Sequence, residues 1–265
     1  MGECNLCNGV GIRVQSQGDF ALAACCDCKD PCTVCQGSGY FFETDEFGYR
    51  LATPCACRDL AKRARMFTDA NIPARYESAQ FGRILTDKGA SDIVTAKRQA
   101  WRFAREYEPG APGILLYGTV GTGKTYLTAA ILRYLILSRG VRARFIEFMH
   151  LLSDLRATFG DRGQAEVVMR PLVEVPLLVI DELGKGRGSD WELNVLDELI
   201  SKRYNARRTT VFTTNYGIES QIQNGESSET ETLLDRVGVR IHSRLMEMCD
   251  PVRLSGQDLR REIRT

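Results

Sequence analysis

The sequence has few histidines, no long apolar run and almost no net charge. Only two histidines occur, His150 and His242, which disfavours acyl transfer that depends on histidine as a base. No apolar run approaches the roughly 18 residues of a membrane-spanning helix, so we expect no membrane partner. A net charge of +1 provides no overall attraction to nucleic acid, and such binding must depend on local patches.

The N-terminus also lacks the features of a secretory signal peptide. Residues 1–6 contain neither a basic segment nor an apolar one. We therefore expect a cytoplasmic protein, in which the ten cysteines stay reduced and are available for metal binding. A chain of 265 residues can hold one sizeable α/β domain and a small additional module.

Segment 113–125 has the sequence of a phosphate-binding loop. It contains G-x-x-x-x-G-K-T between an apolar run typical of a buried strand and a segment with helical periodicity. The glycines let backbone N–H groups point at phosphates beside the N-terminus of a helix. A chance glycine-rich turn would not need this flanking strand and helix. We expect ATP to contact Gly118, Thr119, Val120, Gly121, Thr122, Gly123, Lys124, Thr125 and Tyr126.

Several polar side chains have expected roles around this loop. Lys124 would reach the β- and γ-phosphates, and the Thr125 hydroxyl would bind Mg²⁺. The apolar run 177–180 ends in Asp181 and Glu182, the Walker B pattern, in which the aspartate holds Mg²⁺ and the glutamate orients the attacking water. Asn215 follows the predicted strand 209–214, so we expect it at the same carboxyl edge of the sheet, near the γ-phosphate.

Nine cysteines precede residue 58, and eight of them form two similar units. Each unit joins a C-x-x-C pair, followed by glycines, to a C-x-C pair about twenty residues later. Four thiolates supplied as two close pairs suit tetrahedral Zn²⁺ better than an iron–sulfur cluster or a redox dithiol. Cys25 remains an alternative to Cys26 in the first unit. The expected zinc ligands are Cys4, Cys7, Cys26 and Cys28, then Cys32, Cys35, Cys55 and Cys57.

The motifs predict an α/β fold in three parts. These are a small zinc-ribbon-like module with two Cys₄ units (1–60), a linker with lead-in helices (61–111) and an ATPase domain (112–265) with a parallel sheet flanked by helices. The module is too short to bury a sufficient core, so zinc would stabilise its fold. Within the last part we expect segment 171–176 to be a connection and the final helix to lie at 239–246.

The order of these motifs resembles the AAA+ ATPases of the bacterial helicase-loader group, which includes the DnaC and DnaI loaders and the IstB transposition helpers. The resemblance covers about residues 67–263 and implies a P-loop AAA+ core without a full helical lid. It also implies that Arg244, with Arg240 as the alternative, is an arginine finger acting on the nucleotide of a neighbouring subunit. Arg260 would be the sensor-2 arginine, and a finger acting in trans requires a homo-oligomer.

The resemblance implies a function in replication or transposition. As a loader, the chain would place a replicative DnaB-type helicase on single-stranded DNA, with the zinc module docking on the helicase. As an IstB-like helper, it would bind duplex DNA and recruit a transposase. The basic loop 184–188 is either a phosphate-backbone contact or an ordinary surface loop. A small-molecule kinase fits less well, because it needs a lid and an acceptor pocket.

Overall fold

The computed structural model describes residues 4–259 except 5, 8–9, 29–31, 33, 37, 45–47, 56, 85–90, 159, 187, 219–221, 224–225, 228–230 and 257. The chain forms two compact units. The first comprises residues 1–78 and 135–141, and the second comprises residues 79–134 and 142–265. Among the described residues, no helix is both long and apolar enough to cross a membrane.

The second unit is built on a five-stranded parallel sheet, as predicted. Its strand order is β11-β5-β8-β7-β6. Every residue of the neighbouring strands β7 and β8 is buried, because helices cover both faces of the sheet. The strands are β5 (Gly113–Tyr117), β6 (Ala143–Glu147), β7 (Leu177–Asp181), β8 (Thr209–Thr214) and β11 (Cys249–Arg253).

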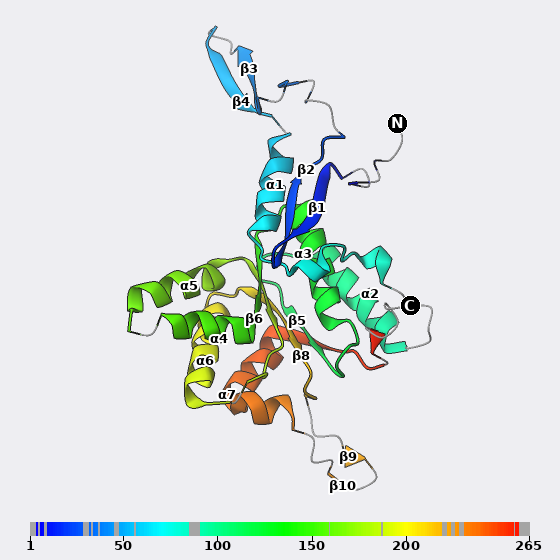
Figure 1. The fold of residues 1–265 in the computed structure, drawn as a ribbon, viewed down its shortest axis with the longest axis vertical. Helices are drawn as coiled ribbons and strands as arrows, with labels where there is room; N and C mark the ends of the chain where they lie inside the picture. Colours follow the sequence, from blue (N-terminus) through cyan, green and yellow to red (C-terminus); the bar gives the residue numbers. More distant parts are fainter. Residues whose placement is uncertain are drawn as a thin grey trace. The chain divides into compact units, whose positions relative to one another are not determined.

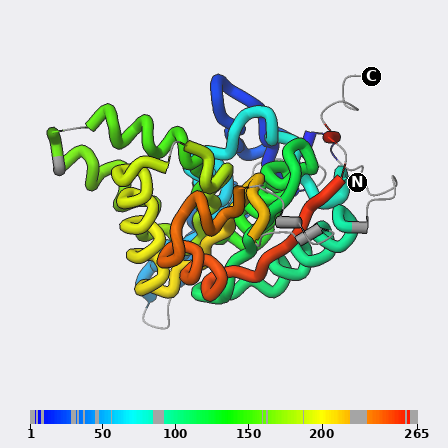
Figure 2. Tube along the Cα trace, turned by 90° about the horizontal axis from the view of Figure 1, so that it is seen from below, coloured from blue at the N-terminus to red at the C-terminus, as the bar shows by residue number. Residues whose placement is uncertain are grey.

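Helices lie on both sides of this sheet (Figure 1). One side carries α2 (Ser91–Glu106) and α3 (Lys124–Arg139), and the other carries α4 (Phe148–Ala157), α5 (Arg162–Glu174), α6 (Asp190–Asn205) and α7 (Leu233–Met248). On the second side, α5 packs on α6 and α6 on α7 (Figure 2). Leu115, Ile180 and Phe212 share this face of the sheet and form one buried cluster with α4 to α7.

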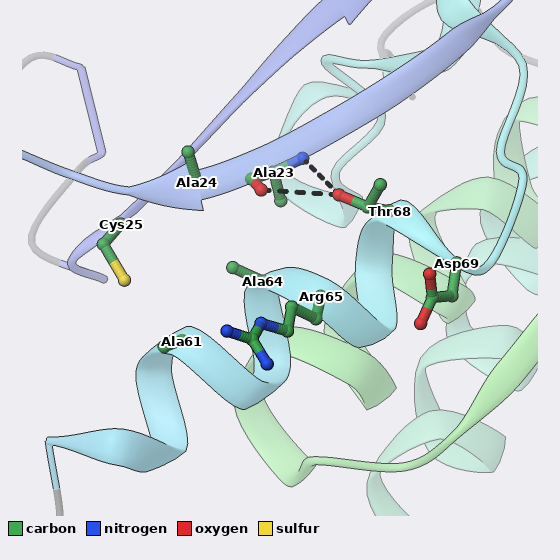
Figure 3. A pocket seen from close by; sticks show the side chains of 8 residues that line it. All are labelled: Ala23, Ala24, Cys25, Ala61, Ala64, Arg65, Thr68 and Asp69. Carbon is green, nitrogen blue, oxygen red and sulfur yellow. Dashed lines mark hydrogen bonds between the residues drawn. The ribbon is translucent and has the colours of Figure 1, made fainter. Parts of the chain in front are cut away.

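The first unit contains two antiparallel hairpins and one helix. The hairpins are β1 (Ile12–Gln17) with β2 (Phe20–Cys25), and β3 (Tyr40–Thr44) with β4 (Arg50–Pro54); the helix is α1 (Arg58–Thr68). The Thr68 hydroxyl fixes α1 to β2, because it accepts from the Ala23 N–H at 3.1 Å and donates to the Ala23 carbonyl at 3.4 Å (Figure 3). Beside this contact lies a cavity of about 320 Å³ lined by small side chains of both elements.

Short elements complete the described fold. They are the 3₁₀ turns η1 (Ala74–Tyr76) and η2 (Phe81–Arg83) and the two-residue strands β9 (Ile222–Gln223) and β10 (Glu226–Ser227). After β11, the described residues 254–256 and 258–259 contain no α-helix.

The prediction that segment 171–176 is a connection was wrong, because Pro171 lies inside α5. Proline removes one helical hydrogen bond. The helix nevertheless continues, since its Met169 and Leu172 side chains are buried in the core and the Asp161 carboxylate caps its first turn by accepting from Gln164 N–H at 3.1 Å.

The last helix is longer than the predicted segment 239–246. α7 begins at Leu233 behind a capping box, in which Thr232 and Asp235 bind each other's backbone N–H groups. Gly238 interrupts it with φ of 77°, a left-handed conformation that favours glycine, so the two halves meet at a kink.

A fully buried arginine, Arg203 on α6, joins three elements of the second unit. Its guanidinium donates to the end of α5 and to β8 over distances of 2.6 to 3.2 Å. Burial lowers the pKa of Arg203 to about 9, which leaves it charged at neutral pH. The acceptors are the carbonyls of Leu172, Val173, Val175 and Thr209 and the hydroxyl of Thr210.

We predict that Arg203→Met lowers the free energy of unfolding by about 3 kcal/mol, because it leaves several buried acceptors without donors. Urea denaturation followed by circular dichroism measures this change. The matched control is Lys202→Met at the next position, where an exposed pair with Glu198 is lost and about 0–1 kcal/mol is expected. Equal losses for the two variants would contradict the role of Arg203.

Candidate functional site

The predicted phosphate loop connects β5 to α3 and packs against the segment that follows β11. Gly118 and Gly121 have φ of 132° and 83°, in the region that favours glycine. A Cβ atom at Gly118 would lie 2.1 Å from the Leu254 carbonyl oxygen, and one at Gly121 would lie 2.1 Å from Asp258 Oδ1. Both glycines are therefore required by close packing as well as by the backbone conformation.

Lys124 is buried inside this loop, with its ammonium group directed at loop carbonyls. Its Nζ donates to Gly118 O at 2.9 Å and Thr119 O at 2.7 Å, and the Thr122 hydroxyl donates to the Thr119 carbonyl at 2.9 Å. The loop also leads into the N-terminus of α3, the end of a helix at which the backbone N–H groups point outward. A lysine beside a helix N-terminus fits a polyphosphate.

Asp181 lies beneath the loop, at the carboxyl end of β7, and is buried. The Thr125 hydroxyl lies 3.0 and 3.1 Å from its two carboxylate oxygens, and the Thr213 hydroxyl donates to Oδ1 at 2.6 Å. Burial raises the pKa of Asp181 to about 6, while the hydrogen bonds from the two threonines act in the opposite direction. The adjacent carboxylate and hydroxyl oxygens are the donor set that Mg²⁺ prefers.

Thr213 is a part of this site that sequence reasoning missed. It lies on β8 beside Asp181, and its hydroxyl oxygen also accepts from the Glu182 N–H at 3.0 Å. It therefore fixes both residues of the Walker B pair. The only signal in the sequence was its place one residue before the end of the predicted strand 209–214, two residues before Asn215.

Glu182 and Glu147 form an acidic pair at the same edge of the sheet. Lys185 Nζ pairs with the Glu182 carboxylate and lies 3.7 Å from Glu147 Oε1. Burial and then the negative charge of Glu182 raise the pKa of Glu147. Glu147 was missed because only the strand register places it opposite Asp181.

Loop 184–188, for which the sequence left a phosphate-backbone contact and an ordinary surface loop open, has its lysine engaged within the site. Ion pairs with Glu147 and Glu182 compensate the charge of Lys185. Its other basic residue, Arg187, lies outside the described part of the chain.

The predicted arginines differ in their surroundings. Arg244 Nη1 donates to Asp197 Oδ1 at 2.7 Å and to Ser201 Oγ at 2.5 Å, and its side chain is 21% exposed. Arg240 lies one turn earlier on α7, with its side chain 71% exposed and its Nε 3.5 Å from Asp197 Oδ1. Asn215 is exposed after β8. Arg260 lies outside the residues that the structure describes.

The structure brings the eight predicted cysteines together in two groups. Within each group the sulfur atoms lie within 4.8 Å of one another. The sulfur pairs that contact across each group are 3.3 to 3.8 Å apart, close to the roughly 3.8 Å between ligands of tetrahedral Zn²⁺ with Zn–S of 2.3 Å. The groups are Cys4, Cys7, Cys26 and Cys28, and Cys32, Cys35, Cys55 and Cys57.

The surroundings of these thiols favour a cation. Backbone N–H groups of Leu6 and Cys7 lower the pKa of Cys4 to about 7, and the Gly39 N–H points at the Cys35 sulfur at 3.3 Å. By contrast, hydrogen bonds with Cys26 and Cys7 raise the pKa of Cys28, because thiolates this close cannot all ionise without a positive charge among them. A Zn²⁺ ion would supply that charge.

Cys25 stands apart from the first group. Its thiol is exposed and faces the cavity between β2 and α1, beside Ala61 and Ala64 (Figure 3). The grouping therefore contains Cys26, the residue preferred from the sequence, and leaves Cys25 out.

Known proteins are similar in sequence to this chain. It is 25% identical over 204 residues to the uncharacterized protein YqaM of Bacillus subtilis, an alignment that covers 74% of this chain and 60% of YqaM. It is 28% identical over 160 residues to the replicative helicase loader DnaC of Escherichia coli K12, covering 60% of this chain and 64% of DnaC. The aligned regions thus span less than two thirds of either relative.

The fold is also similar to that of a solved helicase loader. The crystal structure of the DnaC helicase loader superposes with a TM-score of 0.59 and 27% identity, covering 68% of this chain and 99% of that one. The predicted AAA+ fold is confirmed by this similarity together with the parallel sheet.

The family is defined by a match to most of the chain. Residues 55–262 match the family model described as IstB-like ATP binding protein. This range includes the phosphate loop, Asp181, Glu182 and the two finger candidates Arg240 and Arg244. The resemblance predicted from the sequence is confirmed, and the chain belongs to the IstB-like ATP-binding protein family.

Proposed function

We propose that this protein hydrolyses ATP in a Mg²⁺-dependent reaction and loads a replicative DnaB-type helicase onto single-stranded DNA. The observation that carries the proposal is the similarity to the DnaC loader, in sequence and in fold, over the region that contains the assembled loop. The family membership supports ATP as the nucleotide.

Each site residue has a role in this proposal. Lys124 exchanges its bonds to the loop carbonyls for bonds to phosphate oxygens. Thr125 and Asp181 would hold Mg²⁺, which would supply positive charge beside the phosphates. Glu182 orients and polarises the attacking water, and its pair with Lys185 must open for that role. Asn215 lies exposed at the carboxyl edge, where it can sense the γ-phosphate.

Oligomerisation would complete the catalytic site. In a homo-oligomer, an α7 arginine reaches the nucleotide of the neighbouring subunit and stabilises the transition state. Arg244 remains the proposed finger, positioned by Asp197 and Ser201, and the more exposed Arg240 is the alternative. We assign the sensor-2 role to Arg260.

The two cysteine groups are the proposed zinc sites. We infer one Zn²⁺ in each group and a module, residues 1–60, that docks on the helicase. Residues 61–111 link it to an ATPase domain at 112–265. The eight clustered thiols support zinc, and the division of the chain into two compact units supports a separate docking part. We infer that the protein acts in the cytoplasm.

A second function has one specific observation in its favour. The matching family model is named for IstB-like proteins. In that role the chain would bind duplex DNA and recruit a transposase, with the same ATPase site.

The ATPase part of the proposal predicts two different defects. Lys124→Ala should abolish ATP binding, because the loop loses its only lysine. Glu182→Gln should retain binding but lower kcat by at least about 100-fold, because the attacking water loses its base. Isothermal titration with an ATP analogue and a phosphate-release assay separate the two effects. Normal turnover by either variant would exclude the assigned role.

The partner is tested with the zinc-loaded, full-length chain immobilised on a sensor surface. We expect purified hexameric DnaB-type helicase from the source organism to bind in the presence of Mg²⁺ and an ATP analogue. A transposase offered with duplex DNA should not bind. The reverse pattern would replace the loader by the transposition helper.

A further inference from the structure

The hairpin of β3 and β4 has an exposed face that the proposed ATPase and metal sites do not use. The two strands form a sheet of their own (Figure 1). Their register pairs Phe42 with Ala52 and Thr44 with Arg50, so these side chains share one face with Tyr40. Tyr40 is 41% exposed and Phe42 is 61% exposed. We call the set Tyr40, Phe42 and Arg50, with Arg58 above it, the aromatic face.

Each ring of the aromatic face is stacked with an arginine. The Arg58 guanidinium carbon lies 4.1 Å from the centre of the Tyr40 ring, and that of Arg50 lies 5.0 Å from the centre of the Phe42 ring. Such cation–π contacts keep planar guanidinium groups on planar rings. The surface therefore combines two flat stacking platforms with two positive charges.

The acidic side chain of β3 lies on the opposite face. Glu43 alternates with Phe42 along the strand, and its Oε2 accepts from the Thr53 hydroxyl at 3.0 Å. Among the described residues of β3 and β4, no carboxylate shares the aromatic face. Its charge is thus complementary to an anion.

The spacing of the rings selects among anionic polymers. Tyr40 and Phe42 are two residues apart on a strand, which separates them by about 6.6 Å. This distance is about twice the 3.4 Å rise of stacked bases in a duplex. Two successive bases can each cover one ring only when the strand is extended and unpaired. Duplex DNA, whose bases are already stacked within the helix, cannot use these platforms.

We propose that the aromatic face binds extended single-stranded DNA. Bases replace the guanidinium groups on the Tyr40 and Phe42 rings, and Arg50 and Arg58 turn from the rings to the phosphates. Stacking on aromatic rings with arginine contacts is a sequence-tolerant way to hold a single strand. The inference rests on the proposed function in taking single-stranded DNA as the substrate, and it assigns the strand a site outside the ATPase core. The remaining surface of the cysteine module would then dock on the helicase.

The test uses full-length, zinc-loaded protein without nucleotide and a fluorescein-labelled oligothymidylate of about 12 residues. The double variant Tyr40→Ala/Phe42→Ala should weaken binding at least tenfold in fluorescence anisotropy, since stacking of one base alone contributes about a factor of ten. The matched control is Leu51→Ala, an exposed apolar residue on the opposite face, which should bind within about twofold of the unchanged protein.

The contribution of the two arginines is measured separately, from the salt dependence of DNA binding. Arg50→Gln and Arg58→Gln should each reduce the slope of log Kd against log salt by about 0.7, the value for one phosphate contact on a single strand. Zinc content, expected at about two ions per chain, and helicase binding are measured for every variant. Variants that keep both have a folded cysteine module.

Three results would overturn the inference. These are absence of oligothymidylate binding by the unchanged protein, unchanged affinity of the double variant, and loss of helicase binding with oligothymidylate binding intact. The last result would make the aromatic face a protein interface. Failure of the loader proposal is distinguishable, because the unchanged protein would then bind no helicase whatever the double variant does with DNA.

Discussion

The arrangement of the second unit depends on the buried carboxylate of Asp181. Two hydroxyls, from Thr125 at the start of α3 and Thr213 on β8, meet at this carboxylate and join the phosphate loop to the two central strands. Burial opposes its charge, and the hydrogen bonds only partly offset that cost. A bound divalent cation would complete the compensation, so the same contacts that hold the sheet edge together prepare a metal and nucleotide site.

The first unit is stabilised differently from the second. Its β3–β4 hairpin is a sheet of two strands, which alone is only marginally stable in water. Two groups of four thiols lie in this unit, and a metal ion in each group would stabilise the fold where the hydrophobic core is small. The second unit is instead stabilised by a buried sheet.

Local motifs were predictable from the sequence, and cross-element contacts were not. The phosphate loop, Asp181 and the cysteine pairs were found because a few neighbouring residues define each of them. Helix α5 was missed because tertiary packing overrides the interruption by Pro171. Glu147 and Thr213 required the strand register, and Arg203 required the fold around it. The start of α7 was readable, since Thr232 and Asp235 form a capping box.

We propose that this chain uses ATP to place a ring helicase on single-stranded DNA. The most direct measurement mixes purified helicase with closed circular single-stranded DNA, which has no end to thread, and separates the circles by gel filtration. We expect the helicase to elute with the circles only when this protein and ATP are both present. Helicase that elutes free of the circles under those conditions would show that the chain is not a loader.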